Sequence, residues 1–539
     1  MLFNSYEFIF AFLPITLFGM FLMGRFATRR GAIAWLILCS VVFYGLWNPL
    51  SLAIILPSIG VNYLLARWML QHMATAGPQS RKASWALILG IVFNLCFLGY
   101  FKYKNFFLES TNLALGTHFA LVATILPLGI SFITFQKIAF LVDVRVGTIK
   151  SFDAVEFLIF VFFFPQLIAG PIVHYREMVP QFSQGSRRIE AASLAIGLAI
   201  FAMGLFKKAV MADGIAPYAN TTFNAAEQGQ LIGFVQGWLG ALAYTLQLYF
   251  DFSGYSDMAI GLARMFGIRL PANFNSPLKA SSMIDFWGRW HLTLTRFLTA
   301  YVYTPLVLRL TRWRMAQGKT VLGRNQRDLA GFAVLVAWPT LLTMFLSGLW
   351  HGAGNTFIVW GLLNGLLLVL NHAWRHWRPK LDKANYERVM KPLGFVMTFT
   401  SIVVLMVLFR AKTMAGAGQM LQAMAGGQGI SLPAAVLGRL GGAGQWLAGL
   451  GVGADTSSGT ALLQSGAWVG ALLLAALCLP NSMEVARQFE PALNFRAPAG
   501  KPPQLVMQLN LAWASGLGLM LVAGVLSLNR ISEFLYWQF

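Results

Sequence analysis

Two histidines stand in polar, aromatic surroundings inside otherwise apolar stretches of the sequence. His351 follows the run from Leu341 to Trp350, and His291 ends a segment that begins at Asp285. An ionisable side chain in a long apolar stretch is costly to bury and is by default a candidate for function. Imidazole titrates near neutral pH, so it can take a proton from a hydroxyl group and return it to a leaving group. We therefore expect acid–base chemistry at these two residues.

Each histidine also has a purely structural interpretation. His351 fits a helix-packing histidine that is hydrogen-bonded to a neighbour. His291 fits an interfacial anchor, in which tryptophan and arginine hold a segment at the membrane surface. Four of the remaining histidines lie in predicted loops or basic clusters: His72, His118, His372 and His376. The interpretation of the fifth, His174, stays ambiguous.

A second group of polar side chains interrupts an apolar run between Tyr249 and Asp257. The carboxylates and hydroxyls of this group, at Asp251, Tyr255 and Asp257, need partners, because an unpaired polar group is costly to bury. A cavity lining and a structural polar network both remain open. The basic residues available as partners are Arg264, Lys207 and Lys208.

Several other chemistries lack their motifs here. The sequence contains no G-x-S-x-G nucleophile elbow, Walker A loop, dinucleotide-binding glycine pattern or H-E-x-x-H. The three cysteines, Cys39, Cys96 and Cys478, have the spacing of neither a zinc site nor a disulfide framework. We therefore expect no metal and no bound cofactor, and a histidine base with direct attack rather than a serine acyl-enzyme.

The composition places these residues in a membrane. Of 539 residues, 57% are hydrophobic and 11% charged, and the mean hydropathy is +0.64. Soluble domains carry about 25% charged residues. Apolar runs such as Trp85–Phe101 recur along the chain, and a helix needs about 20 residues to cross a bilayer. We predict an all-α, polytopic membrane protein.

The charge pattern indicates topology rather than nucleic-acid binding. The net charge is +21, and the basic residues gather in short clusters between apolar runs, near residues 25–30, 81–82, 309–314 and 375–380. Cytoplasmic loops carry such an excess of lysine and arginine. The first apolar run has no basic region before it, which favours an uncleaved first helix over a secretory signal.

We expect roughly 11–13 membrane helices by the length criterion. Pro127, Gly129, Pro165, Gly170 and Pro171 interrupt two of the runs. The stretch 284–308 carries charges and is expected to be re-entrant or interfacial. Broken backbone at membrane depth needs protein or a water-filled cavity around it. The predicted division is a membrane core at 1–412, a Gly/Ala-rich loop or interfacial segment at 413–462, and C-terminal helices with a tail at 463–539.

Several motifs, taken together and in order, resemble the membrane-bound O-acyltransferase (MBOAT) family. Within it they are similar to the bacterial polysaccharide branch that contains the membrane subunit of alginate O-acetylation. The similarity covers most of residues 1–410 and the C-terminus. The segments that carry it are Leu126–Gln136, Phe164–Ile172, Gly204–Lys208, Tyr249–Asp257, Asp285–His291, Ser347–Gly352 and Phe534–Phe539.

The resemblance implies a ring of helices around a thin centre, with a cavity on each side and a central tunnel between them. It implies that His351 is the catalytic histidine and His291 the second histidine of the branch. An acyl thioester such as acetyl-CoA would enter from the cytoplasm. The acceptor would lie on the far side, on a periplasmic partner of the SGNH-hydrolase type that completes transfer to a polysaccharide, with the chain itself in the bacterial inner membrane.

The remaining polar and aromatic residues of these motifs are candidates for substrate binding. They are Asp285, Arg289, Trp290, Trp350, Asn355, Gln136, Gln166, Asp251, Tyr255, Asp257 and Lys207.

The sequence departs from the family after His291. The acidic residue common in the family is missing from the stretch Phe297–Tyr301, and a basic insertion follows at about 309–327. These departures leave the polymer open. Two other functions also remain, a transporter or flippase and a non-catalytic scaffold of a polysaccharide export complex. The absence of a repeat disfavours a transporter, and only the need for His351 separates an enzyme from a scaffold.

Overall fold

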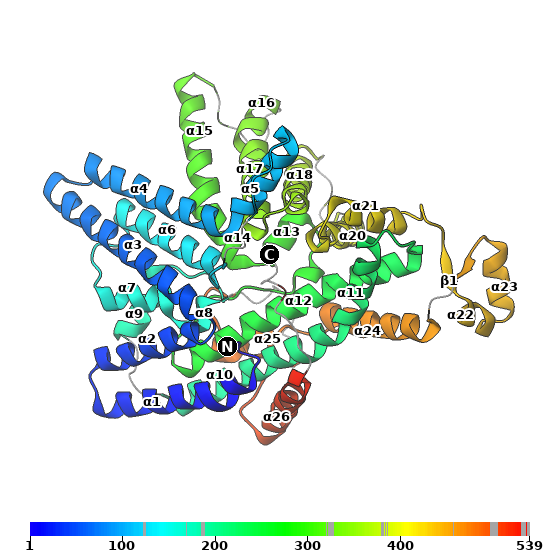
Figure 1. Ribbon diagram of the computed structural model, residues 1–539, viewed down its shortest axis with the longest axis horizontal. Helices are drawn as coiled ribbons and strands as arrows, with labels where there is room; N and C mark the ends of the chain where they lie inside the picture. The colour runs from blue at the N-terminus through cyan, green and yellow to red at the C-terminus, as the bar shows by residue number, and fades with distance from the viewer. Residues whose placement is uncertain are drawn as a thin grey trace. The chain divides into compact units, whose positions relative to one another are not determined.

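Helices make up almost all of the secondary structure in the computed structural model of the chain (Figure 1). The structure describes all residues except 122–124, 169, 185–188, 320, 322–327, 379–381, 383, 385, 456–457, 496–504, 530–534 and 536–539. Within this part of the chain, eight helices are long and apolar enough to cross a membrane. They are Phe8–Phe26, Pro49–Ala76, Arg81–Leu115, Ala191–Glu227, Leu329–His351, Asn355–Trp377, Tyr386–Arg410 and Gly459–Cys478.

The predicted class, an all-α polytopic membrane protein, is confirmed. The predicted helix number was larger because it also counted shorter or more polar runs, such as 31–47, 155–175 and 284–308. A further apolar helix, Leu511–Leu526, is shorter than a full span. The ring with a central tunnel stays a prediction.

The chain forms two compact units that interleave in sequence. Unit 1 comprises Met1–Phe206, Gly254–Asn273 and Ser482–Asn529. Unit 2 comprises Lys207–Ser253, Phe274–Asn481 and Arg530–Phe539. Helix α12 (Phe234–Met265) contributes to both units. The sequence-based division at 412 and 462 followed composition and stays a prediction.

Unit 1 is a set of helices from the N-terminal part of the chain, joined by two short C-terminal segments. Its helices are η1 (Phe8–Phe12), α1 (Leu13–Phe26), α2 (Arg29–Gly45), α3 (Pro49–Ala76), α4 (Arg81–Leu98), η2 (Gly99–Tyr103), α5 (Lys104–Leu115), α6 (Ile130–Val146), α7 (Ala154–Phe162), α8 (Phe164–Leu167), α9 (Tyr175–Gln184), α10 (Ala191–Phe206), α25 (Ser482–Val485), η8 (Arg487–Phe489), α26 (Leu511–Leu526) and η9 (Ser527–Asn529).

The predicted interruptions in unit 1 are real helix boundaries. Helix α6 begins directly after Gly129, whose φ of 65° favours glycine. A Cβ on Gly129 would also meet the carbonyl oxygen of Leu167 at 2.5 Å. Helix α7 ends before Phe163, and Pro165 lies in the first turn of α8, where its missing N–H is tolerated. Pro and Gly therefore break these runs as their backbone chemistry requires.

Unit 2 contains the two candidate histidines. Its elements besides α12 are η3 (Lys207–Ala212), α11 (Asp213–Glu227), η4 (Pro277–Lys279), α13 (Met283–Trp287), α14 (Leu292–Leu298), η5 (Thr299–Tyr303), α15 (Thr304–Ala316), α16 (Leu329–Phe332), η6 (Ala333–Ala337), α17 (Trp338–His351), α18 (Asn355–Trp377), η7 (Tyr386–Met390), α20 (Lys391–Arg410), α21 (Met414–Met424), β1 (Ser431–Pro433), α22 (Ala434–Arg439), α23 (Gly442–Gly449), β2 (Gly453–Asp455) and α24 (Gly459–Cys478).

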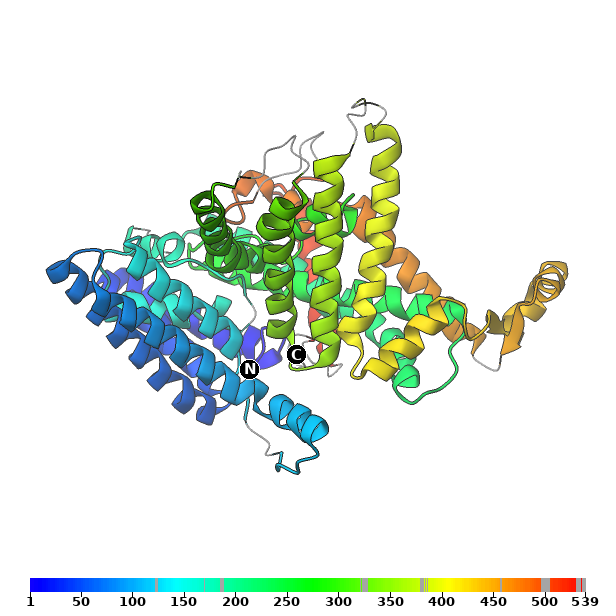
Figure 2. The same cartoon turned by 90° about the horizontal axis from the view of Figure 1, so that it is seen from above.

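Helices α17 and α18 form an antiparallel pair that lies side by side in both views (Figures 1 and 2). Two glycines allow their backbones to touch. A Cβ on Gly348 would lie 3.1 Å from the Cα of Gly361, and a Cβ on Gly361 would lie equally close to Gly348. Small residues at such crossings let membrane helices approach closely. The crossing fixes the last turn of α17, which carries His351.

The stretch 284–308 is not one helix. Helices α13 and α14 are short, a turn separates them, and η5 and α15 continue the chain. The predicted irregular character of this stretch is therefore visible in the structure, although its position relative to a membrane stays a prediction.

The structure gives regular elements to the stretch 413–462, which is predicted as a Gly/Ala-rich loop or interfacial segment. It contains α21, α22, α23 and the start of α24, and β1 pairs with β2 in parallel register. We refer to residues 430–458 as the arm; it extends past the end of α24 (Figure 1). Gly- and Ala-rich helices have weak hydrophobic periodicity, which explains why the sequence did not reveal them.

Candidate functional site

His351 is the last residue of α17 and is buried, with 3% of its surface exposed. Three aromatic rings surround its imidazole. The ring centroids of Trp350, Phe409 and Trp360 lie 4.8, 5.1 and 5.2 Å from that of His351. These rings come from α17, α20 and α18, so helix packing rather than a loop fixes the histidine.

His291 occupies the turn between α13 and α14 and is fully buried. Its φ of 44° and ψ of 51° are left-handed, which is unusual for a residue other than glycine. The ring of Phe252 packs edge-on against it at 4.8 Å. Because burial disfavours the charged form, the pKa of His291 falls to about 3, and the imidazole is neutral at physiological pH. The turn itself lies outside the eight candidate spans.

The fold brings the two histidines together. The ring centroids of His291 and His351 are 6.4 Å apart, and Trp350 lies beside both, 6.0 Å from His291 and 4.8 Å from His351. The two residues that the sequence singled out for acid–base chemistry therefore form one site in unit 2.

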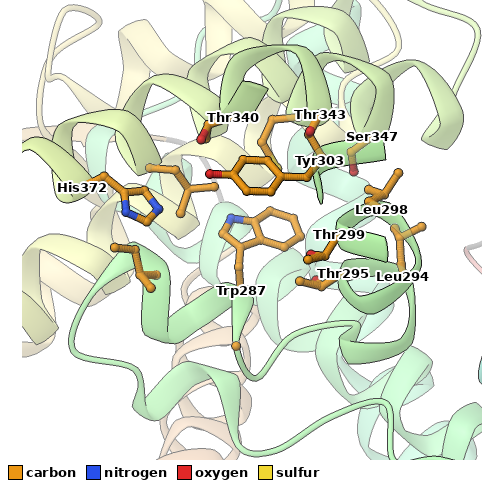
Figure 3. Close-up of a pocket in the computed structure, with 14 residues that line it drawn as sticks. Trp287, Leu294, Thr295, Leu298, Thr299, Tyr303, Thr340, Thr343, Ser347 and His372 are labelled. Atoms are coloured by element: carbon orange, nitrogen blue, oxygen red, sulfur yellow. The ribbon is translucent and has the colours of Figure 1, made fainter. Parts of the chain in front are cut away.

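A cavity of about 330 Å³ opens next to this pair (Figure 3). Its walls come from α13, α14, η5, α17 and α18. Apolar side chains dominate, with a set of hydroxyls among them. The hydroxyl-bearing lining residues are Thr295, Thr299, Tyr303, Thr340, Thr343 and Ser347.

Neither His291 nor His351 lines this cavity. Two residues of the cavity wall, however, connect it to His351. Ser347 lies one helical turn before His351 on α17 and faces the cavity. Trp287 lines the cavity and packs against Trp360 at 5.9 Å, and Trp360 packs in turn against His351. The cavity and the histidine pair therefore share walls.

Two buried polar groups of the cavity wall have no hydrogen-bond partner among the described residues. They are the Oγ of Ser347 and the Nε1 of Trp287. Buried polar groups are normally paired, so an orphaned pair at a cavity indicates a place for a polar ligand or water. The indole of Trp287 points into the cavity, opposite Tyr303 (Figure 3).

The predicted binding residues next to His291 have local partners. Asp285 and Arg289 form an ion pair at 2.7 Å, one turn apart, and both side chains are partly exposed. Asp285 also accepts a hydrogen bond from the backbone of Ser281. Trp290 is buried and stacks on Phe286 at 5.7 Å. This geometry stabilises the α13–α14 turn, and it leaves a role in donor binding as a prediction.

Two predicted binding residues lie near His351 in the sequence, Trp350 and Asn355, and their surroundings differ. Trp350 is buried beside both histidines. Asn355 is the first residue of α18 and is exposed. Trp350 is therefore well placed to shape the site, while the role of Asn355 stays a prediction.

Asp251 belongs to a buried ion network in unit 2. Lys208, not Lys207, provides its positive charge, at 2.6 Å, and also binds Asp213 at 2.8 Å. Lys208 and Asp251 are both almost fully buried. A buried ammonium held by two carboxylates fits the structural interpretation of this polar island, with α12 tied to η3 and α11. Substrate binding by Lys207 stays a prediction.

The other predicted binding residues lie in unit 1. Gln136 is buried on α6, and Gln166 donates to the carbonyl oxygen of Phe160 at 2.6 Å. Tyr255 stacks on Phe3 at 4.9 Å. Asp257 accepts a hydrogen bond from the hydroxyl of Ser482 at 2.5 Å. These contacts all lie within unit 1, and a substrate-binding role for the four residues stays a prediction.

The sequence did not point to Trp287, Ser347, Trp360 and Phe409. Trp287 and Ser347 stood inside recognised motifs, each four residues before a candidate histidine in the sequence, which was the available signal. Trp360 and Phe409 reach His351 through helix packing alone. Within the described residues, no three His, Cys, Asp or Glu side chains gather in a way that could hold a metal ion. That no metal takes part stays a prediction.

Only Leu535 of the C-terminal segment Phe534–Phe539 belongs to the described residues, and it is buried. Because Leu535 is buried, its side chain offers no exposed docking surface. The other five residues lie outside the described part of the chain.

Comparison with known proteins confirms the predicted family. The family model described as MBOAT, membrane-bound O-acyltransferase family, matches residues 82–316. The peptidoglycan O-acetyltransferase of Helicobacter pylori is 40% identical over 460 residues, which cover 80% of this chain and 81% of that protein.

Two further relatives extend the comparison. The probable alginate O-acetylase AlgI of Pseudomonas aeruginosa is 38% identical over 429 residues, covering 79% of this chain and 75% of that protein. The teichoic acid D-alanyltransferase of Bacillus subtilis is 29% identical over 274 residues, covering 50% and 65%. All three names describe transfer of an acyl group.

Proposed function

The chain belongs to the membrane-bound O-acyltransferase family, and from this premise we propose that it moves an acetyl group from a cytoplasmic thioester to a hydroxyl acceptor outside the cytoplasm. The product of the pathway would be an O-acetylated polysaccharide, in keeping with the names of the relatives. The observation that carries the proposal is the pair of buried imidazoles beside a cavity with orphaned polar groups.

The charge pattern supports a cytoplasmic position for the cavity. Basic clusters lie at Arg309–Arg314, before α17, and at Arg375–Arg378, at the end of α18, and such clusters favour the cytoplasmic side. The cavity is lined by His372, five residues from the end of α18, which is about 8 Å along a helix. His351 lies at the opposite end of the α17–α18 pair. A donor entering from the cytoplasm would therefore meet the cavity first and His351 afterwards.

The cavity suits the acyl end of a thioester donor. Its apolar walls fit a flexible chain with few charges, and the orphaned Ser347 hydroxyl and Trp287 N–H are donors for carbonyl oxygens. Helix α15 continues from the cavity wall at Tyr303 and carries exposed Arg309 and Arg312. Such arginines fit the phosphates of coenzyme A, so acetyl-CoA is the donor that this arrangement favours.

His351 acts as the general base in this proposal. Its imidazole takes the proton from the acceptor hydroxyl as the oxygen attacks the thioester carbonyl carbon. The carbon–sulfur bond then breaks, and the same proton passes to the departing thiolate. The aromatic rings around His351 exclude water, which would otherwise hydrolyse the donor. We place His351 at the narrowest point of the path.

His291 has a different role because its lowered pKa makes it a weak base. A neutral imidazole can hold a hydrogen bond to the carbonyl oxygen or to the acceptor, and the left-handed turn fixes its direction. Asp285 and Arg289 stabilise that turn through their ion pair. His291 therefore positions the reacting groups.

We further propose that the acceptor belongs to a separate protein of the SGNH type outside the cytoplasm, and that the chain lies in the bacterial inner membrane. A hydrated polymer would lose water from many hydroxyls on entering a buried site without gaining enough partners. The histidine pair is buried, so a single protein hydroxyl is a better acceptor than a polysaccharide chain. The partner would then transfer the acetyl group to the sugar.

Reconstitution of the purified chain tests the relay. Proteoliposomes receive acetyl-labelled coenzyme A and the polymer, with or without the second protein. We expect labelled polymer only when the second protein is present. Efficient labelling of the polymer without it would contradict the relay, while leaving the acyltransferase chemistry intact.

A further inference from the structure

A second cavity, distant in sequence from the histidines, lies at the base of the arm in unit 2. Its volume is about 360 Å³, within the range of ligand pockets, which begins near 300 Å³. Its walls come from α11, the start of α12, both arm strands and the first turns of α24. We call it the arm-base pocket.

The pocket has a lining rich in groups that both donate and accept hydrogen bonds. Hydroxyls come from Tyr218, Thr221, Thr222, Ser431, Ser458 and Ser465. The amide of Gln236 and the carboxylate of Asp455 add further partners. Apolar side chains, among them Leu239 and Leu462, cover part of the wall. The cavity beside His351 has no carboxylate or amide in its lining, so the two pockets differ in the ligands that they suit.

The walls of the pocket are held in place by hydrogen bonds of the neighbouring backbone. Ile232 donates to the side chain of Gln428 at 2.7 Å, and Phe234 donates to the carbonyl oxygen of Gly429 at 3.2 Å. Gly453 donates to Ile430 at 2.8 Å, beside the parallel pairing of β1 with β2. The base of the arm is thus fastened to α12, and the pocket is a preformed feature.

Charge indicates on which side of the membrane the pocket lies. Helix α20 leads from the basic region 375–391 to residue 410, and the arm follows. Between residues 411 and 458 the only charged residues are Lys412, Arg439 and Asp455. Because α20 is one of the candidate spans, the arm is on the side opposite to the basic region, which is the side of the proposed acceptor.

From these observations we propose that the arm-base pocket binds a neutral sugar unit of the polysaccharide. A sugar ring offers many hydroxyls, each a donor and an acceptor, and faces of C–H groups, which match the mixed lining. Among the described lining residues, Asp455 alone is charged, and its carboxylate accepts from hydroxyls but repels an anionic sugar. Bound there, the polymer would be held beside the acyl-carrying partner. The inference rests on the proposed function in one respect, that the sugar belongs to the polysaccharide that is acetylated.

The test measures glycan binding directly, without acetyl transfer. The full-length chain in detergent is titrated with a neutral N-acetylhexosamine tetramer and, separately, with a tetra-uronate of the same length, and binding is followed by saturation-transfer NMR. We expect the neutral tetramer to bind more tightly than the uronate. Absence of binding for both, or tighter binding of the uronate, would overturn the proposal.

Variants of two lining residues locate the binding. Asp455→Asn removes the carboxylate and should weaken the neutral tetramer about tenfold, the cost of one charge-assisted hydrogen bond. The same change should strengthen uronate binding, because repulsion is removed. Tyr218→Phe, which keeps the ring, should weaken the neutral tetramer a few-fold. Unchanged binding in both variants would place the sugar elsewhere and contradict the pocket.

Two controls separate this inference from other effects. Trp446 is an exposed aromatic residue of the arm outside the pocket lining, so Trp446→Ala should bind the neutral tetramer as the native chain does. Loss of binding in Trp446→Ala as large as in Asp455→Asn would contradict the pocket as the site. His351→Ala should also bind normally, which distinguishes a failed sugar site from failed acyl transfer.

Discussion

The two histidines of the candidate site are held by opposite kinds of structure. His351 ends a regular helix whose position is set by the close crossing of α17 and α18 at Gly348 and Gly361. His291 lies between two short helices in a left-handed conformation. The position of His351 thus depends on packing between long helices, whereas that of His291 depends on a local turn. A reactive base benefits from the more rigid support, and a positioning group tolerates the local one.

The largest effect is expected from removing the base. His351→Ala should lower the rate of acetyl transfer about 10²- to 10⁴-fold, the usual range for a general base. The rate is measured with purified chain, labelled acetyl-CoA and acceptor protein. His72 is a partly exposed histidine of α3 outside the site, so His72→Ala should keep the native rate. Near-native transfer by His351→Ala would contradict the assignment of His351 as the base and of His291 as the positioning group.

The support of His351 can be broken without touching the imidazole. Gly348→Ala places a methyl group against the backbone of α18 and forces the helices apart, which should cost about 1–3 kcal/mol of stability. Transfer should fall as well, because His351 moves relative to His291. The measurement combines the thermal unfolding midpoint in detergent with the transfer rate.

A glycine with open space provides the matched control. No atom of the described residues lies within 4 Å of a Cβ built on Gly470 in α24. Gly470→Ala should therefore keep or raise the midpoint, since alanine favours helices by about 1 kcal/mol. If Gly348→Ala were as stable and active as Gly470→Ala, the close crossing would not be what holds His351.

The turn at His291 is tested by two substitutions that differ in backbone tolerance. Asparagine accepts the left-handed conformation better than alanine. His291→Asn should therefore keep the native unfolding midpoint, whereas His291→Ala should lose about 1 kcal/mol of unfolding free energy and have a lower midpoint. Both should slow transfer about tenfold through one lost hydrogen bond. Equal stability of the two variants would show that the turn stores no strain.

The pH dependence of the same variants separates a positioning group from a base. Burial lowers the pKa of His291 to about 3, so the side chain is neutral above that pH and binds no proton between about pH 5 and 8. The acid-side midpoint of the rate profile should therefore be the same in His291→Asn as in the native chain. A shifted midpoint would mean that His291 itself titrates during transfer.

The smallest effect concerns the cavity next to the pair. Trp287→Phe keeps an aromatic ring against Trp360 but removes the unpaired Nε1 donor. The KM for acetyl-CoA should rise a few-fold with kcat nearly unchanged, as expected for one neutral hydrogen bond made in both ground and transition states. A loss of kcat alone would place Trp287 in the chemical step instead.

The sequence predicted the features of the chain that depend on local chemistry. Histidines within apolar stretches, the break at Gly129 and the irregular stretch around His291 all follow from burial costs and backbone preferences. The contacts between distant helices were not predictable in this way. Phe409 contacts His351 only because α20 packs against the end of α17. The sequence around either residue gives no indication of this contact.

Two further differences have simple physical reasons. Lys207 and Lys208 are neighbours, and only the path of η3 decides which of them turns toward Asp251. The arm is rich in glycine and alanine, whose weak hydrophobic pattern concealed its helices and the pairing of β1 with β2. The pattern of the sequence thus indicates which residues are costly to bury, whereas the packing of the helices decides which of them come into contact.

The most direct test of the central claim is sided transfer in sealed proteoliposomes that contain the native chain or His351→Ala. Labelled acetyl-CoA is supplied only on the face that carries the basic clusters, and the acceptor protein only on the opposite face. We predict that the native chain labels the acceptor across the membrane, and that His351→Ala leaves it unlabelled while both chains are inserted equally. Equal labelling by the two chains, or labelling only when donor and acceptor share one face, would contradict the account.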